Sequence, residues 1–182
     1  IRNDGTVYSA FNHSQDYWQK YYYGQNKTDH FRDVKKILWT QKQIICLKKD
    51  GTLDATEFIG SADHRWFDWN EIKYWRNIKK LYYITGRMVG IKDDGSLVAT
   101  TRKTSSDNKR YDYWNDIKNW QNVEMFYWSE NELVALTEYG NILYAQNPQK
   151  FDRSKSFFHK MKSWNNIAKL YFGVGVAAGL RL

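Results

Sequence analysis

The sequence predicts an all-β fold, a β-propeller of four blade-equivalents of about 45 residues with short helical turns between the strands. Glycines in turn-type contexts recur at intervals of 46, 44 and 45 residues, at Gly5, Gly51, Gly95 and Gly140. Aromatic residues recur at intervals of 44, 45 and 44 residues, at Phe31, Trp75, Trp120 and Trp164. A fixed period of roughly 20 to 50 residues is typical of solenoids, propellers and repeat arrays.

The composition is a third observation in favour of β structure. Aromatic residues make up 18% of the 182 residues, and flat or branched side chains pack well on a pleated surface. The apolar fraction of 42% suffices for the core of one ordinary domain. We therefore expect a single repeat domain over residues 1–182, with units at about 1–36, 37–80, 81–125 and 126–169, and residues 170–182 beginning or closing a further blade.

The first recurring element is an apolar run of four residues before each glycine turn, at residues 44–47, 88–91, 133–136 and 177–180. Nearly continuous apolar character predicts a strand that is buried on both faces. The third position of the run holds only small residues, Cys46, Gly90, Ala135 and Gly179, which indicates crowded backbones. We expect this run to be the innermost strand of each blade, beside a central axis.

The turn and the strand after it complete a hairpin. In Asp50-Gly51 and Asp94-Gly95 the glycine supplies the positive φ of a tight turn. The second strand is expected at residues 6–10, 52–56, 96–100 and 141–145. Each unit is therefore at least a β-hairpin.

A polar, variable segment such as residues 101–109 comes next, followed by large residues spaced three apart, as in Trp114-x-x-Ile117-x-x-Trp120. This spacing places them on one side of a helical turn. It predicts short helices that end at Asn77, Asn122 and Asn166, although aromatic-rich outer strands would give a similar spacing. A return strand, such as residues 78–84, then leads to the next unit.

The two ends of the sequence have the same phase in the repeat, since residues 180–182 align with residues 1–3. One interpretation is a closed ring in which residues 176–182 supply the strand that the first unit lacks. The other interpretation, which we prefer, is a segment of a longer array. Without closure the terminal strand edges are exposed, so self-association through these edges is also expected.

One stretch resembles a known family. Residues 75–99 contain Trp-x-Asn-Ile-x-x-Leu and then Val-Gly-Ile-Lys-x-Asp-Gly-Ser-Leu-Val-Ala, and residues 4–12 are similar to the second strand and turn of the same repeat. Both resemble the bacterial version of the regulator of chromosome condensation repeats. The resemblance implies a β-propeller that serves as a recognition platform, commonly for a protein partner. The usual glycines after the second strand and the usual His before the apolar run are missing, so lectin-like propellers of similar repeat length remain an alternative.

Charge and hydrophobicity limit the classes of protein. The net charge of +8 is uneven, at +5 for residues 136–182 and −2 for residues 91–135, and we attribute most of it to solvated lysines. No apolar stretch approaches the roughly 18 residues of a membrane span, and the first residues lack the apolar segment of a signal peptide. The single Cys46 excludes an internal disulfide. An extracellular or cell-surface location is slightly preferred to the cytoplasm.

We expect no catalytic residue, metal site or cofactor. The four histidines, His13, His30, His64 and His159, occupy different phases of the repeat, and none has metal-ligand spacing. Asp63, Asp68 and Glu71 could meet near one loop, but paired acids are common outside active sites.

Binding residues are expected where aromatic side chains accompany polar groups after the variable segments. The candidates are Tyr22, Trp66, Trp69, Arg110, Tyr111 and Tyr113. Aromatic rings with a polar group suit protein interfaces, and flat ring faces also suit sugars. Core packing between blades is the alternative for such residues, and we prefer it for Trp75, Trp120 and Trp164.

The predicted function is therefore a non-catalytic recognition scaffold that binds a protein partner through its loops and blade faces. A carbohydrate-binding, lectin-like propeller is the alternative. Binding of nucleic acid or another polyanion is a more distant alternative, because Asp107, Asp112 and Asp116 oppose the basic residues around 102–110.

Overall fold

The computed structural model describes residues 1–7, 28, 30–39, 44–56, 69–84, 87–101, 112–128, 132–147, 160–161, 163–173 and 176–181. Within these ranges the protein is mostly β and consists of small antiparallel sheets. The predicted β class is confirmed.

The described sheets follow one another along the sequence. The first contains β1 (Val34–Trp39), β2 (Ile44–Lys48) and β3 (Leu53–Ala55), and the second contains β4 (Ile78–Ile84), β5 (Arg87–Lys92) and β6 (Leu97–Ala99). The third contains β7 (Val123–Trp128), β8 (Glu132–Thr137) and β9 (Ile142–Gln146). The fourth contains β10 (Ile167–Gly173) and β11 (Val176–Arg181).

The apolar runs at residues 44–47, 88–91 and 133–136 form the middle strands of the first three sheets, so the prediction of an innermost strand is wrong. β2, β5 and β8 each pair with a neighbour on both sides. Neighbouring side chains, the repeating tryptophan among them, leave little room at the third position of the run. A Cβ atom added at Gly90 would lie 3.0 Å from the Val98 side chain and 3.2 Å from the Trp75 ring, and one added at Gly179 would lie 3.1 Å from the Trp164 ring.

Two short helices, α2 (Trp69–Ile72) and α3 (Trp114–Ile117), lie at the predicted positions but end earlier than expected. After α2 the chain makes a tighter turn, in which the N–H of Trp75 donates to the carbonyl of Ile72 at 2.9 Å. Asn77 then has a left-handed φ of 59°, so it opens the next strand rather than ending the helix. None of the helices described has the length and hydrophobicity needed to cross a membrane.

A joint made of backbone atoms connects each sheet to the next. The turn glycine has a φ between 74° and 79°, and its carbonyl accepts the N–H of the residue that opens the next sheet at 3.0 Å. The pairs are Gly5 with Val34, Gly51 with Ile78, Gly95 with Val123, and Gly140 with Ile167. The residue before each of these strands also has a positive φ, between 54° and 59°, at Asp33, Asn77, Asn122 and Asn166. Glycine is required because a Cβ at Gly95 would lie 2.6 Å from the Asn122 Cα.

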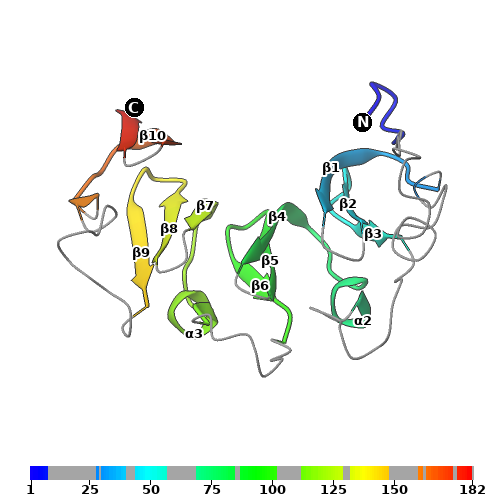
Figure 1. The fold of residues 1–182 in the computed structure, drawn as a ribbon, viewed down its shortest axis with the longest axis horizontal. Coiled ribbons are helices and arrows are strands. Elements are labelled where there is room, and N and C mark those ends of the chain that lie inside the picture. The colour runs from blue at the N-terminus through cyan, green and yellow to red at the C-terminus, as the bar shows by residue number, and fades with distance from the viewer. Residues whose placement is uncertain are drawn as a thin grey trace, which may run out of the picture.

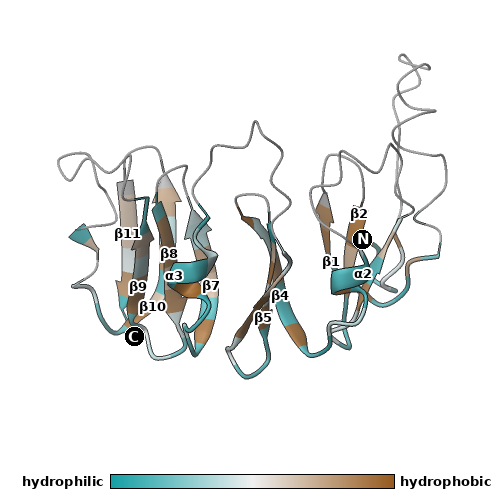
Figure 2. Cartoon of the chain, turned by 90° about the horizontal axis from the view of Figure 1, so that it is seen from below, coloured by the Kyte–Doolittle hydropathy of each residue, from teal (hydrophilic) through white to brown (hydrophobic). Residues whose placement is uncertain are grey.

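Each pair of neighbouring sheets shares a hydrophobic cluster. Between the first and second sheets, Ile45 and Leu47 pack in one cluster with Ile78 and Leu81. Similar clusters lie between the second and third sheets and between the third and fourth. Hydrophobic residues accordingly concentrate on the strands, whereas the turns and much of the helical surface are hydrophilic (Figure 2). The core is therefore a series of inter-sheet layers.

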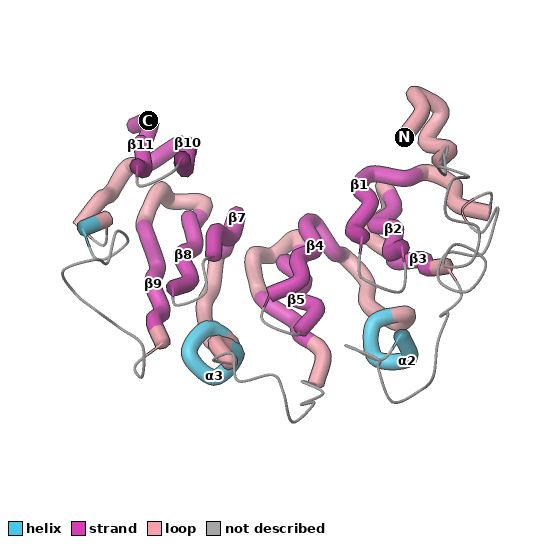
Figure 3. Tube along the Cα trace, viewed as in Figure 1, coloured by secondary structure: helices cyan, strands magenta, loops and turns pink. Residues whose placement is uncertain are grey.

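The sheets are arranged along an open arc (Figure 1). β1, β4, β7 and β10 lie on the inner side of the arc, and α2 and α3 lie on its outer side (Figure 3). We call these four strands the inner strands. β11 pairs with β10 at the end of the arc opposite to residues 1–7, so the four-unit ring considered from the sequence is not formed by the described residues.

Candidate functional site

The structure describes two of the six predicted binding residues. Tyr22, Trp66, Arg110 and Tyr111 lie outside the described residues. Trp69 opens α2 and is partly buried against the cluster between the first two sheets. Tyr113 precedes α3, is 1% exposed and belongs to the cluster between the second and third sheets. Trp69 and Tyr113 therefore lie in different cores, and Tyr113 offers almost no surface to a ligand.

A largely buried ion pair connects the described residues on either side of the segment that carries Arg110 and Tyr111. Arg87 at the start of β5 donates from Nε to Asp112 Oδ1 at 2.9 Å and from Nη2 to Asp112 Oδ2 at 2.6 Å. Its Nη1 also donates to the carbonyl of Thr100. The two paired side chains are only 14% and 22% exposed, and a bidentate guanidinium–carboxylate pair is geometrically specific. The second sheet thus holds both flanks of this segment in place.

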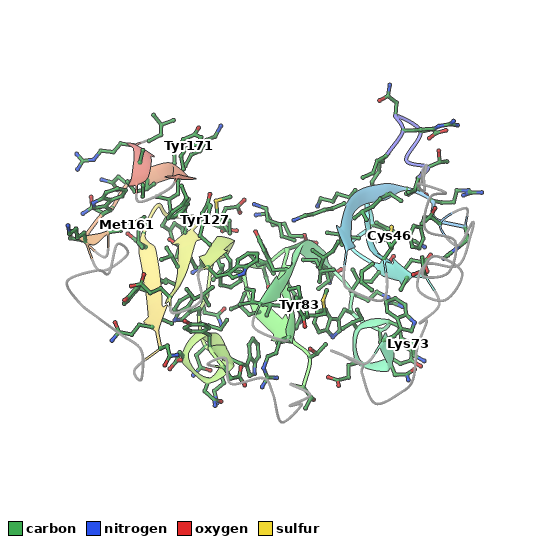
Figure 4. The ribbon with its side chains drawn as sticks, in the orientation of Figure 1. Cys46, Lys73, Tyr83, Tyr127, Met161 and Tyr171 are labelled. Carbon is green, nitrogen blue, oxygen red and sulfur yellow. The ribbon has the colours of Figure 1, made fainter. Side chains whose placement is uncertain are left out.

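The inner strands carry a repeating tyrosine, at Tyr82, Tyr127 and Tyr171. The Tyr82 ring stands edge-on to Phe126 at 5.5 Å and to Trp128 at 5.9 Å. Tyr127 also reaches the following sheet, with its ring tilted by 42° to that of Phe172 at 4.1 Å and its hydroxyl donating to the Leu170 carbonyl at 2.8 Å. Each of these two tyrosines therefore reaches from its own inner strand to the next. Figure 4 labels Tyr127 and Tyr171.

The environment keeps these hydroxyls neutral. Burial raises the pKa of Tyr82 to about 12, although a hydrogen bond from the Phe126 backbone opposes the rise. Burial also raises the pKa of Tyr127. Both tyrosines are therefore packing and hydrogen-bonding groups at neutral pH, rather than sources of negative charge.

A strip of three side chains crosses the inner strands of the first three sheets. Lys36 of β1 places its Nζ 5.1 Å from the ring centroid of Tyr82, and Tyr82 contacts Trp128 of β7. Trp128 remains 45% exposed, although one part of its ring packs against Tyr82. We call Lys36, Tyr82 and Trp128 the inner strip. It combines a cation, a fixed aromatic ring and an accessible indole, which suits recognition of another molecule.

Charged groups next to the inner strip tie the second sheet to the third. Glu124 of β7 accepts from Lys79 Nζ at 2.5 Å and from Lys80 Nζ at 2.7 Å, and Lys79 lies 3.5 Å from Glu138. Burial raises the pKa of Glu124, but the hydrogen bonds from Lys79 and Lys80 outweigh it, so that the pKa lies below its ordinary value. Glu124 is therefore ionised at neutral pH and offsets one of the two lysine charges.

The described residues contain no group of three His, Cys, Asp or Glu side chains that could hold a metal ion. Cys46 is buried, and burial raises the pKa of its thiol to about 11, so the thiolate needed for nucleophilic attack is scarce at neutral pH. His30 lies 3.6 Å from Asp54 in a partly exposed pair. The other three histidines lie outside the described residues.

No protein-family model matches the chain, and no curated protein matches it with significance.

The inner strip was not among the predicted binding residues. Its signal is present in the sequence, where the equivalent positions Leu38, Tyr82, Tyr127 and Tyr171 are aromatic in every sheet after the first. From the sequence alone, the aromatic clusters after the variable segments are the stronger signal, and residues 78–84 are predicted only as a return strand. Trp128 stands out once the structure shows that it is both packed and exposed.

Proposed function

We propose that this chain is a non-catalytic recognition scaffold of the β-propeller type, with repeats related to those of the regulator of chromosome condensation, and that it binds a protein partner. The proposed blades correspond to the successive sheets, since the same backbone joint recurs at Gly51, Gly95 and Gly140. A scaffold of repeated sheets presents its inner strands and its loops as separate surfaces. The function depends on these surfaces rather than on the fold itself.

The observation that carries the proposal is the inner strip. Trp128 is 45% exposed on an inner strand, beside the Tyr82 ring and near Lys36. Tryptophan and tyrosine side chains that are held by neighbouring packing lose little conformational entropy on binding, and these residues are enriched among those that contribute most to the affinity of protein interfaces. The segments that carry Trp66 and Tyr111, which lie outside the described residues, are the second part of the proposed binding surface.

Affinity capture with purified wild-type chain and two matched variants tests this proposal. We expect Trp128→Ala to lose a protein that the wild-type chain retains, and Tyr74→Ala to retain it, because Tyr74 is 70% exposed but lies just after α2 on the outer side of the arc. Trp66→Ala tests in the same way whether the segment that carries Trp66 contributes to binding. Equal retention by the wild type and Trp128→Ala would exclude the inner strip.

Carbohydrate binding is the second candidate, and the accessible indole of Trp128 favours it, because sugars stack on flat aromatic faces. A glycan array separates the two candidates. A saturable signal that free sugar competes, and that is lost in Trp128→Ala, would replace the protein partner with a glycan. Capture of a protein that free sugars do not displace would support the protein partner.

A further inference from the structure

Lys36 and Lys80 occupy equivalent positions of consecutive inner strands, yet their ion pairing differs. Each is the first residue paired with the middle strand after the register shift of its sheet. Lys80 donates from Nζ to Glu124 of the next inner strand at 2.7 Å. No carboxylate in the part of the chain that the structure describes forms an ion pair with Lys36, which is exposed. These residues therefore leave the positive charge of Lys36 without a counter-charge.

The repeat explains why the two lysines differ. Glu124 lies within the register shift of β7, and the residue at the equivalent position of β4 is Lys79. Lys36 extends toward β4, where its Nζ lies 5.1 Å from the ring centroid of Tyr82. The strand that Lys36 reaches thus carries a cation at the place where the strand that Lys80 reaches carries a carboxylate. The next inner strand therefore supplies an acid to Lys80 but not to Lys36.

The environment of Lys36 favours an added negative charge. Desolvation of the ammonium group, followed by the positive charge of Lys80, lowers the pKa of Lys36. Both effects disfavour the charged form, and a carboxylate at hydrogen-bonding distance opposes them. Glu124 is already engaged, because it accepts hydrogen bonds from Lys79 and Lys80. An acidic group from another molecule would therefore gain a favourable ion pair at Lys36.

An accessible apolar surface lies close to this cation. The Tyr82 ring is the shared neighbour of the Lys36 ammonium, at 5.1 Å, and of the Trp128 ring, at 5.9 Å. Trp128 is 45% exposed, so a side chain of another molecule can pack on it. Alternate side chains of an extended peptide project from the same face about 7 Å apart. Two alternate side chains of one peptide can therefore reach the Lys36 ammonium and the Trp128 ring together.

We propose that the inner strip binds an acidic peptide segment of the partner protein. An Asp or Glu side chain of this segment pairs with Lys36, and a large apolar side chain two positions away packs on Trp128. The inference rests on the proposed function and names the chemistry of its partner. A single uncompensated lysine suits one carboxylate, whereas Glu124 next to the strip would repel the continuous row of phosphates of a nucleic acid.

Selection from a random peptide library on the immobilised chain tests the proposal. We expect the wild type to enrich peptides with Asp or Glu two positions from a large apolar residue. Lys36→Glu should instead enrich Lys or Arg at that position, because reversal of the charge reverses the preferred partner. A synthetic peptide of the enriched sequence should bind Lys36→Gln about fivefold more weakly than the wild type, as expected for an exposed ion pair. Fluorescence anisotropy measures this loss, which high salt should reduce.

Lys73→Gln is the matched control. Lys73 Nζ lies 5.0 Å from the ring centroid of Tyr74, a contact of the same kind as that of Lys36 with Tyr82, but on the outer side of the arc (Figure 4). This variant should enrich the same acidic peptides as the wild type and bind the synthetic peptide equally well. Circular dichroism checks that each variant is folded.

The selection separates failure of this inference from failure of the proposed function. Enriched peptides that depend on Trp128 but lack an acid, or that bind Lys36→Gln as tightly as the wild type, would overturn the acidic segment and leave the protein partner standing. No enrichment, or enrichment that Trp128→Ala leaves unchanged, would count against both. Single-stranded DNA that displaces the peptide and binds Lys36→Gln more weakly than the wild type would replace the acidic peptide with a nucleic acid.

Discussion

The junction between the second and third sheets and the exposed face of the fourth sheet contain residues from equivalent positions of the repeat. Tyr82 corresponds to Tyr171, and Ile91 corresponds to Leu180. Tyr82 and Ile91 are enclosed by the neighbouring sheet, whereas Tyr171 is 56% exposed and Leu180 is 54% exposed. The difference teaches that burial in this molecule depends on the next sheet and not on the local sequence. The energetic value of a residue should therefore depend on its place along the arc.

The largest expected effect on stability comes from removing the tyrosine ring at Tyr82, in comparison with removing it at Tyr171. Tyr82→Ala should lower the free energy of unfolding by about 3 to 5 kcal/mol, because it leaves a cavity against Phe126 and Trp128. Tyr171→Ala should lower it by less than about 1 kcal/mol, because the ring is 56% exposed. Urea unfolding followed by circular dichroism, at a concentration where light scattering gives the single-chain mass, measures both. Equal losses would contradict the comparison.

The second-largest expected effect comes from adding a side chain at the glycines of the backbone joints between sheets. Gly95→Ala should destabilise the chain by about 2 to 4 kcal/mol, since alanine is strained at a φ of 74° and its Cβ would lie 2.6 Å from the Asn122 Cα. Gly5→Ala is the matched control at the end of the arc, where the nearest backbone atom would lie 3.0 Å away. We expect it to cost about half as much. Thermal unfolding of the two variants gives the order, and a larger loss at Gly5 would show that the joints are not equivalent.

The smallest expected effect comes from the ion pairs of Glu124 with Lys79 and Lys80, at the junction between the second and third sheets. The pKa of Glu124 lies below its ordinary value of 4.5 in the folded chain, so the stabilisation is present above pH 4.5 and is lost as the pH falls through the folded pKa. Glu124→Gln should therefore reduce stability at pH 7 by less than about 1 kcal/mol and have almost no effect at pH 2. High salt should shrink the difference at pH 7.

Melting temperatures of the wild type and Glu124→Gln between pH 2 and pH 7 check this prediction. Glu138→Gln is the control, since Glu138 is 3.5 Å from Lys79, against 2.5 Å for Glu124. A difference between the wild type and Glu124→Gln that grows toward low pH would reverse the sign and exclude the role given to this carboxylate.

The repeat, the hairpins, the glycine turns and the short helices could be predicted from the sequence, because each depends on local chemistry. Gly95 needs a positive φ, and Trp114 and Ile117 have helical spacing, whatever lies beyond them. The order of strands in the sheet was predicted wrongly. A small residue such as Gly90 signals close contact, but the sequence does not say that the contact is with the Trp75 ring rather than with an axis.

The candidate site was less predictable than the fold. Tyr113 combines an aromatic ring with a hydroxyl, as residues of recognition surfaces often do, yet it is 1% exposed between two sheets. Trp128 is large and hydrophobic, as core residues are, yet it is 45% exposed. Burial of both is decided by how neighbouring units pack, and a single sequence gives the period of a repeat but not the angle between its units.

The joints between sheets consist of a glycine carbonyl and a backbone N–H, flanked by a residue that tolerates a left-handed backbone. This part of the connection does not depend on the side chains at exposed positions such as Trp128. During divergence such positions could change while the backbone joint and the buried clusters between sheets stay the same. The exposed part of the inner surface is thus free to acquire new partners at little cost to the architecture.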